Sequence, residues 1–459
     1  MSKQQTMFPE IVEKYFGKVV KKVTEKYNGE KQKPVLLYKT MLTEEYSADL
    51  SWEATELNNV ILAADVVSMD ASIPLKKRGS IGTASGKLAK VALKFKKGEK
   101  EITDLNIMAS RGTKENEIAA KALNDVPRCI GGIEYRNEML FEEALSTGSM
   151  CVEYGEDNDG VGIRVTFVPE KNEVNALVAD WVKHPNIATP REDVQQLFDL
   201  ADDNQSVVGL AMISKKYFEA FRKSRSGKEL VANFERRDFT EKTVLSTPGK
   251  TVFLQALEDE YGVEFRIIDN TFKVQLPSGK EKSVRPWVDA NIVLIPQEVV
   301  GRFVYGTLAE ETNPVDGVKY EKSGSAILIS KYSHNEPSLE ELTAGQELAL
   351  PVLDGAKSIY ILHANVVKEG AISVAEENAS LSFVNAKSTK VIEVDYRGAE
   401  ANLTAFADDD FVTVTLKGNK LTIACAANSA DKAPARNTVI TVTDGVNECQ
   451  ISVTQAANE

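Results

Sequence analysis

The chain has little of the chemistry that most enzymes and metalloproteins need. Its 459 residues include only three histidines, His184, His334 and His363, which lie far apart in the sequence. A catalytic triad or a histidine-based metal centre needs several such side chains to converge. The short motifs of nucleotide-binding proteins, α/β-hydrolases and zinc proteases are also missing. We therefore expect no catalytic residue, no cofactor and no metal, and predict that the protein is not an enzyme.

Cysteines and long apolar runs are also scarce. The four cysteines, Cys129, Cys151, Cys425 and Cys449, have no C-x-x-C spacing, which is typical of reduced core residues. Cys425 and Cys449 fall in strand-like segments, so a disulfide between neighbouring strands is the alternative. No run of eighteen apolar residues exists to span a membrane. The first twenty residues lack the apolar core and cleavage site of a signal peptide.

The charge balance disfavours a general nucleic-acid binder. Sixty-eight acidic residues against 55 basic ones give a formal net charge of -13, which repels phosphate backbones. A hydrophobic content of 42% is enough for a real core, and this length predicts two or three domains.

The N-terminal stretch has the pattern of an amphipathic helix. Apolar residues recur at helical spacing from Phe8 to Val23, and Asn28-Gly29 ends the pattern. Two interpretations remain open: the helix packs on its own subunit, or it is an arm that docks on a neighbouring one.

A basic, glycine-containing region follows at residues 66–108. Its strand-like part alternates Val91, Leu93 and Phe95 with Ala92, Lys94 and Lys96, which predicts one strand of a long hairpin. In an acidic protein, such a hairpin favours contact with acidic surface on another copy, and a solvated loop is the alternative. The residues expected in that contact are Lys76, Lys77, Arg78, Lys94, Phe95, Lys96 and Lys97.

The centre of the chain predicts a mixed α and β fold. Asp125 and Pro127 read as the start of a long helix that ends at Gly148, followed by a two-strand hairpin at 150–168. From 174 to 297 helices and strands alternate, with a capping box at Thr189 and a cap at Ser214. Strands are expected at 207–213, 263–268, 290–295, 326–330 and 358–364, and a helix at 252–260.

The last ninety residues alternate apolar and polar side chains in short runs separated by turns. These runs are Leu421/Ile423/Cys425, Val439/Thr441/Thr443 and Cys449/Ile451/Val453. This period of two predicts the half-buried strands of a small β-sandwich. The stretch resembles the Bacteroidetes-associated carbohydrate-binding domain, an immunoglobulin-like module, at the segments 410–414, 426–428, 436 and 453–455. The family usually has tryptophan where this chain has Phe411, which the resemblance makes a candidate glycan contact.

The body of the chain resembles the Hong Kong 97-type phage capsid fold, and within it the lambda-type capsid protein E family. The segments that carry this resemblance are 137–154, 206–223, 289–306 and 325–364. The resemblance covers roughly residues 8–366 and rests on the order of the elements. It implies an α+β fold with an N-terminal arm, an extended loop, a spine helix, and peripheral and axial domains, plus the C-terminal all-β immunoglobulin-like sandwich. The implied division is 1–60 arm, 61–112 extended basic hairpin, 113–173 spine helix and peripheral strands, 174–325 axial α/β domain, 326–367 return to the peripheral domain, and 368–459 sandwich.

The function that the resemblance implies is that of a major capsid protein of a tailed bacteriophage or prophage. Its partners would be further copies in pentamers and hexamers, scaffold and portal proteins, decoration proteins, encapsidated DNA without specific binding, and host-associated glycans, with no membrane. It would be made in the bacterial host cytoplasm and reside in the virion. The alternatives are another virion protein of tail or fibre, and a surface carbohydrate-binding protein. The helical stretches at 114–148 and 189–260 argue against a tail tube.

Overall fold

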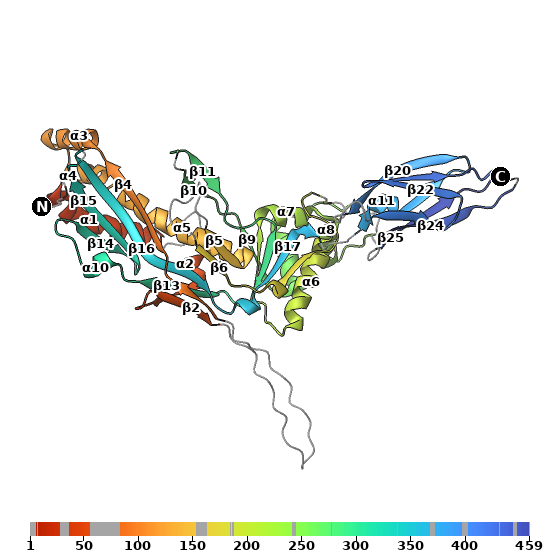
Figure 1. The fold of residues 1–459 in the computed structure, drawn as a ribbon, viewed down its shortest axis with the longest axis horizontal. Helices are drawn as coiled ribbons and strands as arrows, with labels where there is room; N and C mark the ends of the chain where they lie inside the picture. Colours follow the sequence, from red (N-terminus) through yellow and green to blue (C-terminus); the bar gives the residue numbers. More distant parts are fainter. Residues whose placement is uncertain are drawn as a thin grey trace, which may run out of the picture.

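The fold is that of an elongated α+β protein whose three regions lie in a row (Figure 1). The structure, a computed structural model, describes residues 6, 8–27, 36–55, 83–152, 163–183, 185, 188–240, 245–276, 278–336, 338–367, 372–396, 403–430, 432–443 and 448–458.

The first region is built on one long sheet and one long helix. Its N-terminal elements are α1 (Pro9–Tyr27), α2 (Tyr38–Met41), β1 (Leu42–Tyr46), β2 (Ser51–Thr55), β3 (Thr83–Lys87), β4 (Lys90–Lys97), α3 (Glu99–Ser110), α4 (Glu115–Ala122), α5 (Val126–Thr147), β5 (Ser149–Val152) and β6 (Ile163–Thr166). The later elements that return to it are β13 (Gly301–Gly306), α10 (Ala309–Thr312), β14 (Lys319–Ser323), β15 (Ile327–His334) and β16 (Glu340–Leu353). We call β1, β13, β16, β15, β14 and β4 the long sheet, and α5 the spine helix.

The spine helix ends where the sequence predicts. Gly148 adopts a left-handed conformation with φ of 67°, which a glycine tolerates without steric cost. A Cβ atom there would lie 2.6 Å from Cβ of Val168. At the other end Asp125 does not cap the helix, because its carboxylate contacts Lys97 instead.

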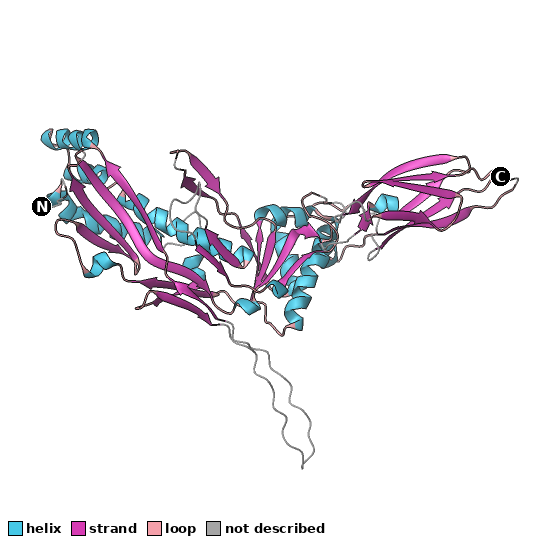
Figure 2. Ribbon diagram, viewed as in Figure 1, coloured by secondary structure: helices cyan, strands magenta, loops and turns pink. Residues whose placement is uncertain are grey.

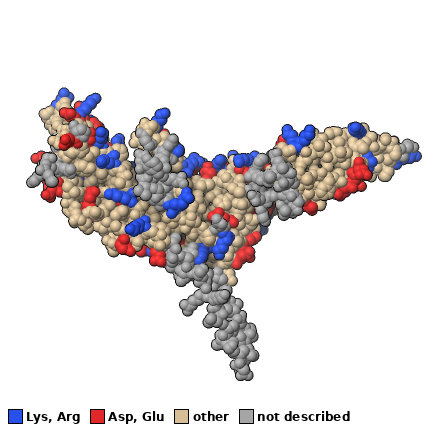
Figure 3. Space-filling view, viewed as in Figure 1, with Lys and Arg blue, Asp and Glu red and all other residues tan. Residues whose placement is uncertain are grey.

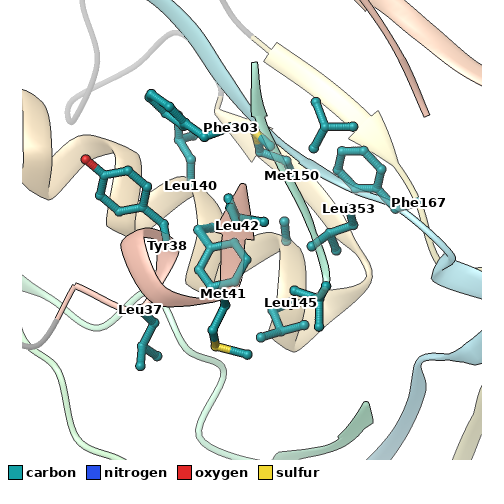
Figure 4. Close-up of a cluster of buried hydrophobic side chains, with 14 of the residues drawn as sticks. Leu37, Tyr38, Met41, Leu42, Leu140, Leu145, Met150, Phe167, Phe303 and Leu353 are labelled. Atoms are coloured by element: carbon teal, nitrogen blue, oxygen red, sulfur yellow. The ribbon is translucent and has the colours of Figure 1, made fainter. Parts of the chain in front are cut away.

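A hydrophobic cluster joins the N-terminal segment, the spine helix and the long sheet (Figure 4). Tyr38, Met41 and Leu42 come from α2 and the start of β1. They pack in one cluster with spine residues such as Leu140 and Leu145. The segment 36–42 is therefore part of the core of its own subunit.

The packing of helix α1 decides between the two interpretations of the N-terminal amphipathic stretch. Val12, Phe16, Val20 and Val23 are buried. They share a cluster with Cys129, Ile130 and Ile133 of the spine helix and with Ile327 and Ile329 of β15. The interpretation of α1 as an arm docked on a neighbouring subunit is therefore wrong, because its apolar stripe is already covered within the chain.

The described part of residues 61–112, predicted as one hairpin, belongs to two different sheets and a helix. The strand that returns from it is β3, which pairs antiparallel with β2. The strand β4 pairs antiparallel with β16 over Glu341–Leu348 and belongs to the long sheet. The helix α3, which the sequence did not predict, follows at once. Residues 56–82 lie outside the described residues.

The second region is a five-stranded mixed sheet between two apolar layers. Its elements are a 3-10 turn at Glu170–Asn172, β7 (Glu173–Ala176), α6 (Pro190–Asp203), β8 (Leu210–Ser214), α7 (Lys215–Lys223), α8 (Arg225–Phe234), α9 (Lys250–Tyr261), β9 (Glu264–Ile268), β10 (Phe272–Gln275), β11 (Glu281–Val284), β12 (Asn291–Ile295), a 3-10 turn at Ala356–Ser358 and β17 (Tyr360–Val367). The strand order is β7-β17-β12-β8-β9, and β10 and β11 form a separate hairpin. Figure 2 shows the helices beside this sheet.

The central strand β12 shows why this sheet forms. All five of its residues are buried, as expected for a short continuous apolar run. Ile292 and Leu294 join the cluster that includes the helices α6 to α9. Val293 and Ile295 join the cluster of the spine helix. One strand thus connects the second region to the first through its two faces.

Two boundaries predicted for this region are wrong. β13 and β14 fall inside 174–325 but belong to the long sheet, and β17 falls inside 326–367 but belongs to the five-stranded sheet. The strand expected at 207–213 begins at Leu210, and the side chain of Val207 is 78% exposed. The cap at Ser214 is confirmed, since its Oγ accepts a hydrogen bond from the Tyr217 amide at 3.3 Å. Thr189 gives no such cap.

The third region is a separate two-sheet sandwich. Its elements are β18 (Ile372–Val374), α11 (Glu376–Ala379), β19 (Ser380–Phe383), β20 (Ser388–Tyr396), β21 (Thr404–Ala407), β22 (Val412–Lys417), β23 (Lys420–Cys425), β24 (Arg436–Thr443) and β25 (Glu448–Gln455). The two sheets have the orders β18-β20-β23-β22 and β19-β25-β24-β21. They enclose one hydrophobic cluster of their own. We call this region the C-terminal module.

The alternation of inward and outward residues predicted for the strands of the C-terminal module is correct, but in one strand the wrong set of residues was predicted to point inward. Leu421, Ile423 and Cys425 point inward as expected. In β24 the inward residues are Ile440 and Val442, not Val439 and its partners. Cys425 and Cys449 lie on opposite sheets and are free thiols, so the alternative of a disulfide is wrong.

Candidate assembly surfaces

The histidines do not converge on a reactive site. His334 lies 3.6 Å from Glu340, while His363 lies between Asn291 and Glu173, 3.0 Å from each. His184 is outside the described residues. Within the described ranges, no group of three or more histidine, cysteine, aspartate or glutamate side chains could hold a metal ion. The geometry therefore directs attention to surfaces and their anchors.

The base of the β2–β3 hairpin is fixed firmly to the body. Arg302 on β13 donates to both carboxylate oxygens of Asp354, at 2.6 and 2.9 Å, and to the carbonyl oxygen of Glu53 on β2 at 2.7 Å. It also donates to Glu45 on β1 at 2.5 Å. A bidentate arginine–carboxylate pair fixes orientation as well as distance. The base of the hairpin is thus held by β1, β13 and β2 together.

Apolar packing supports the same hairpin base. Trp52 on β2 is 5% exposed, and its ring centroid lies 5.9 Å from that of Phe167. A Cβ atom on Gly86 of β3 would lie 3.0 Å from the Trp52 indole nitrogen. The glycine therefore lets the two strands approach around the tryptophan.

The residues predicted to contact another copy have different environments. Lys94 and Lys96 are exposed, and Lys96 pairs with Glu340 of its own chain at 3.0 Å. Phe95 is half-buried against the α1–spine cluster, with the Arg128 guanidinium 5.9 Å from its ring centroid. Lys76, Lys77 and Arg78 lie outside the described residues, so their role in a contact between copies stays a prediction.

Lys97 requires a correction. Its ammonium group contacts the carboxylate of Asp125 and the amide oxygen of Asn124. Both charged side chains are almost fully buried, with exposures of 5% and 7%. Lys97 therefore anchors β4 to the start of the spine helix and does not face another copy. The alternation of the sequence placed Phe95 correctly on the apolar side of β4, but it could not reveal that the spine helix covers that side, where Lys97 also lies.

A row of buried carboxylates runs along the spine helix. Glu134, Glu138 and Glu142 occur at intervals of four residues and are 0–3% exposed. Glu138 accepts hydrogen bonds from the backbone amides of Leu37 and Tyr38 at 2.8 and 2.9 Å. The row therefore holds the N-terminal segment in place through its backbone.

The other two carboxylates of the row have side-chain partners. Glu134 accepts from the Lys39 ammonium at 2.7 Å and from the Tyr38 hydroxyl. Glu142 accepts from Asn270. Sequence reasoning identified the helix but missed this row, although spacing of i, i+4 beside the apolar stripe was the available signal.

Burial raises the pKa values of several of these carboxyl groups. The pKa of Glu142 is raised to about 7 by burial, and that of Glu138 is raised well above its ordinary value by burial and by Glu142. Glu347 on β16 is fully buried, and its pKa is raised to about 8 by burial and by the nearby Glu134. The expected cause is the low dielectric of the interior, which disfavours the charged form of a carboxyl group.

The residues that carry the module's family resemblance meet at one end of the sandwich. Gln455 is fully buried, and its amide donates to the carbonyl oxygens of Ala426 at 2.9 Å and of Val384 at 3.1 Å. Arg436 donates to Gln455 at 2.9 Å and to Ala426 at 3.0 Å. Asn428 donates to the carbonyl oxygens of Pro434 and Ala456. These residues hold the ends of strands together, which explains their spacing without a ligand.

Phe411 belongs to the same end of the module. The Arg436 guanidinium lies 4.1 Å from the centroid of its ring, at the distance of a cation–π contact. The ring is also packed against the module's core. One face of Phe411 is thus covered by Arg436, and its role as a glycan contact stays a prediction.

Charge on the visible face is mixed. Figure 3 shows basic and acidic side chains interspersed over the body, without a broad field of one sign. Asp408, Asp409 and Asp410 form an exposed acidic turn of the C-terminal module. This distribution does not have the basic stripe that is typical of duplex binding.

No helix among the described residues is long and apolar enough to cross a membrane.

Comparison with known proteins shows that the chain is similar in structure to capsid proteins. No protein-family description and no curated protein matches the chain. A prophage protein of E. coli CFT073 assigned as a capsid protein is similar at 12% identity and a TM-score of 0.45, over 79% of this chain and 99% of that one. A phage-related protein of Bordetella bronchiseptica RB50 is similar at 13% identity and a TM-score of 0.40, over 75% and 96% of the two chains.

A third similar structure is the capsid of a native GTA particle, at 10% identity and a TM-score of 0.37, over 72% of this chain and 90% of that one. At these identities and TM-scores the chain is similar to phage capsid proteins, and the likeness carries no functional weight by itself.

Proposed function

We propose that the chain is the subunit of a closed protein shell, the major capsid protein of a tailed bacteriophage or prophage. The observation that carries this proposal is the exposed edge of the long sheet. The strand β1 pairs only with β13 among the described residues, so its other edge is open, and Tyr46 on it is 54% exposed. An open strand edge is a ready site for contact with a neighbouring copy.

The anchors of the fold suit a shell subunit. Arg302 holds the base of the β2–β3 hairpin against β1, through its hydrogen bonds to Glu53 and Glu45. The edge strand β1 presents four exposed residues, Thr43–Tyr46, beside that hairpin base. An exposed strand edge, or a hairpin that is held only at its base, gains stability when a neighbouring copy covers it. We infer pentamers and hexamers as the units of assembly, with scaffold, portal and decoration proteins as further partners.

Sedimentation velocity of the purified chain, together with its scaffold and portal partners, tests this function. We expect large particles of narrow size distribution. A species that remains monomeric under every condition of concentration and salt would rule out the shell.

The cations predicted for the contact between copies, on the hairpin and on β4, are expected to promote assembly by meeting acidic surface on another copy. Replacing Lys76, Lys77, Arg78 and Lys94 together with glutamine should reduce the yield of particles and weaken the dependence of assembly on salt. Exposed pairs contribute only about 0–1 kcal/mol each, so four are changed at once. Yield is measured by light scattering over a series of salt concentrations.

The control for that variant carries the same change of charge elsewhere. Lys114, Lys121, Lys216 and Lys223 are exposed lysines outside residues 61–112, and their replacement with glutamine should leave assembly unchanged. Equal loss in both variants would show that only net charge matters.

The C-terminal module is proposed to be an immunoglobulin-like domain displayed outside the shell. Packaged DNA makes the interior strongly anionic, and the exposed Asp408–Asp410 turn would be repelled from it. Glycan adhesion through many weakly binding copies is the use that the family resemblance favours. DNA inside the shell would be enclosed without specific contacts, and we propose no catalytic activity.

Truncation after Val367 is expected to leave assembly intact. The module has its own two sheets and its own hydrophobic cluster, so the remaining chain keeps every residue of the other clusters. Electron microscopy of truncated and full chains should show shells of equal diameter, with outward density lost in the truncated one. Failure of the truncated chain to assemble, or module density on the inside, would contradict external display.

A further inference from the structure

A cavity of about 350 Å³ lies between the N-terminal segment, the spine helix and the turn that joins β14 to β15. Its walls include the end of α1, α2, the start of β1 and the middle of β16. This volume lies within the range of small-molecule sites, about 300–1,000 Å³. The proposed shell function gives the cavity no role.

Acidic side chains outnumber basic ones in its lining. Glu44, Glu134 and Glu347 face one cation, Lys39, which pairs with Glu134 at 2.7 Å. Glu44 accepts a hydrogen bond from Ser325 at 2.6 Å. The formal charge of the lining is therefore negative, which selects a positively charged occupant.

Glu347 is the unusual member of this lining. It is 0% exposed, and neither of its carboxylate oxygens makes a hydrogen bond of good geometry among the described residues. The side-chain amide of Asn137, which is also unpaired, is its polar neighbour. A buried polar group without a partner costs about 1–3 kcal/mol, and more when it is charged. An occupant that donates hydrogen bonds to Glu347 would remove this cost.

The remaining walls are aromatic and hydroxylic. Tyr27, Tyr38 and Phe303 line the cavity with their rings, and Thr24 and Ser323 contribute hydroxyl groups. Aromatic faces attract organic cations through their quadrupoles. A divalent metal would need several oxygen ligands around one point, and the three carboxylates of the lining do not form such a group, since no cluster of three metal-binding side chains occurs among the described residues.

We propose that this cavity binds a small aliphatic ammonium ion, with a terminal amino group donating to Glu347 and the alkyl part against the aromatic walls. A diamine is the favoured ligand, because the lining holds a second carboxylate outside the Lys39 pair, that of Glu44, for its other amino group. A neutral molecule of the same shape lacks the charge, and an anion would be repelled.

Release of a proton when the ligand binds distinguishes this site from nonspecific electrostatic attraction of the ligand to the surface. Near pH 7 the Glu347 carboxyl is mostly protonated, since its pKa is raised to about 8 by burial. An ammonium donor favours the ionised form, so the carboxyl releases a proton to the buffer when the ligand binds. The release depends on Glu347 and not on surface acids.

Isothermal titration of the full chain with putrescine near pH 7, in two buffers of different ionisation enthalpy, tests the proposal. We expect saturable binding of putrescine, with a heat that differs between the buffers, and no binding of 1,4-butanediol or of Mg²⁺. The variant Glu347→Gln should bind at least about tenfold more weakly and release no proton. The control Glu117→Gln, at an exposed acid of α4, should behave as the unmodified chain.

Three results would overturn the site. They are the absence of saturable putrescine binding, equal binding of putrescine and butanediol, and binding by Glu347→Gln as tight as that of the unmodified chain. The buffer comparison on the unmodified chain needs no variant, so it decides the question even when Glu347→Gln does not fold. Glu347-dependent binding of Mg²⁺ in place of putrescine would also reject the ammonium site.

Discussion

Replacing Lys97 with glutamine is expected to lower the free energy of unfolding by about 3 kcal/mol, the lower end of the cost of breaking a buried ion pair. The partner is Asp125, whose carboxylate is 7% exposed at the start of the spine helix. Without the ammonium group, this carboxylate remains buried and keeps only the guanidinium of the exposed Arg128, 3.3 Å away, as a close cationic contact. Urea denaturation followed by circular dichroism gives the change directly.

Two neighbours on the same strand are matched controls for Lys97→Gln. Lys94 and Lys96 are exposed, so Lys94→Gln and Lys96→Gln should change the stability by no more than about 0.5 kcal/mol. If Lys97→Gln instead left stability unchanged and only reduced assembly, Lys97 would have to face another copy, and its placement in the subunit core would be wrong.

Stability is expected to fall as pH rises from about 5 to about 8, because the folded chain holds protons that the unfolded chain releases. Glu347 has an ordinary pKa of 4.5 that burial and Glu134 raise to about 8. A raised pKa in the folded state gives full stability below the unfolded pKa and loss as pH increases through the folded pKa. At about 1.4 kcal/mol per unit, Glu347 alone accounts for a loss of about 3 kcal/mol between pH 6 and pH 9.

The difference between the unmodified chain and Glu347→Gln isolates this contribution from other titrations. In denaturation series from pH 5 to pH 9, the variant should become the more stable of the two at the alkaline end. Glu142, whose pKa burial raises to about 7, should leave a smaller slope in both proteins. Parallel pH profiles for the two proteins would show that Glu347 ionises normally in the fold.

The sequence predicts elements better than it predicts their partners. The spine helix, its end at Gly148 and the cap at Ser214 follow from residues within one or two turns of each other. The sheet to which β13 or β17 belongs depends on pairing with strands about fifty residues or more away, as in Gly301 with Leu353. Local periodicity contains no information on such pairings, which is why both boundaries were wrong.

The same limit applies to the candidate surfaces. The alternation around Phe95 is that of a half-buried strand whether its cover is the spine helix or another subunit. The predicted phase of β24 was wrong because the polar Thr438 is buried on the same side of the strand as Ile440 and Val442. Gln455 holds strand ends together by hydrogen bonds to Ala426 and Val384. These residues are far from it in the sequence and lie beside it only in the folded sandwich.

The central claim is that copies of this chain close into a shell, and single-particle electron cryomicroscopy of the assembled chain tests it most directly. We predict icosahedral particles built from pentamers and hexamers, with the long sheet and spine helix in the wall and the C-terminal module outside. Open tubes, fibres, or a population of isolated subunits with no closed particles would contradict the account.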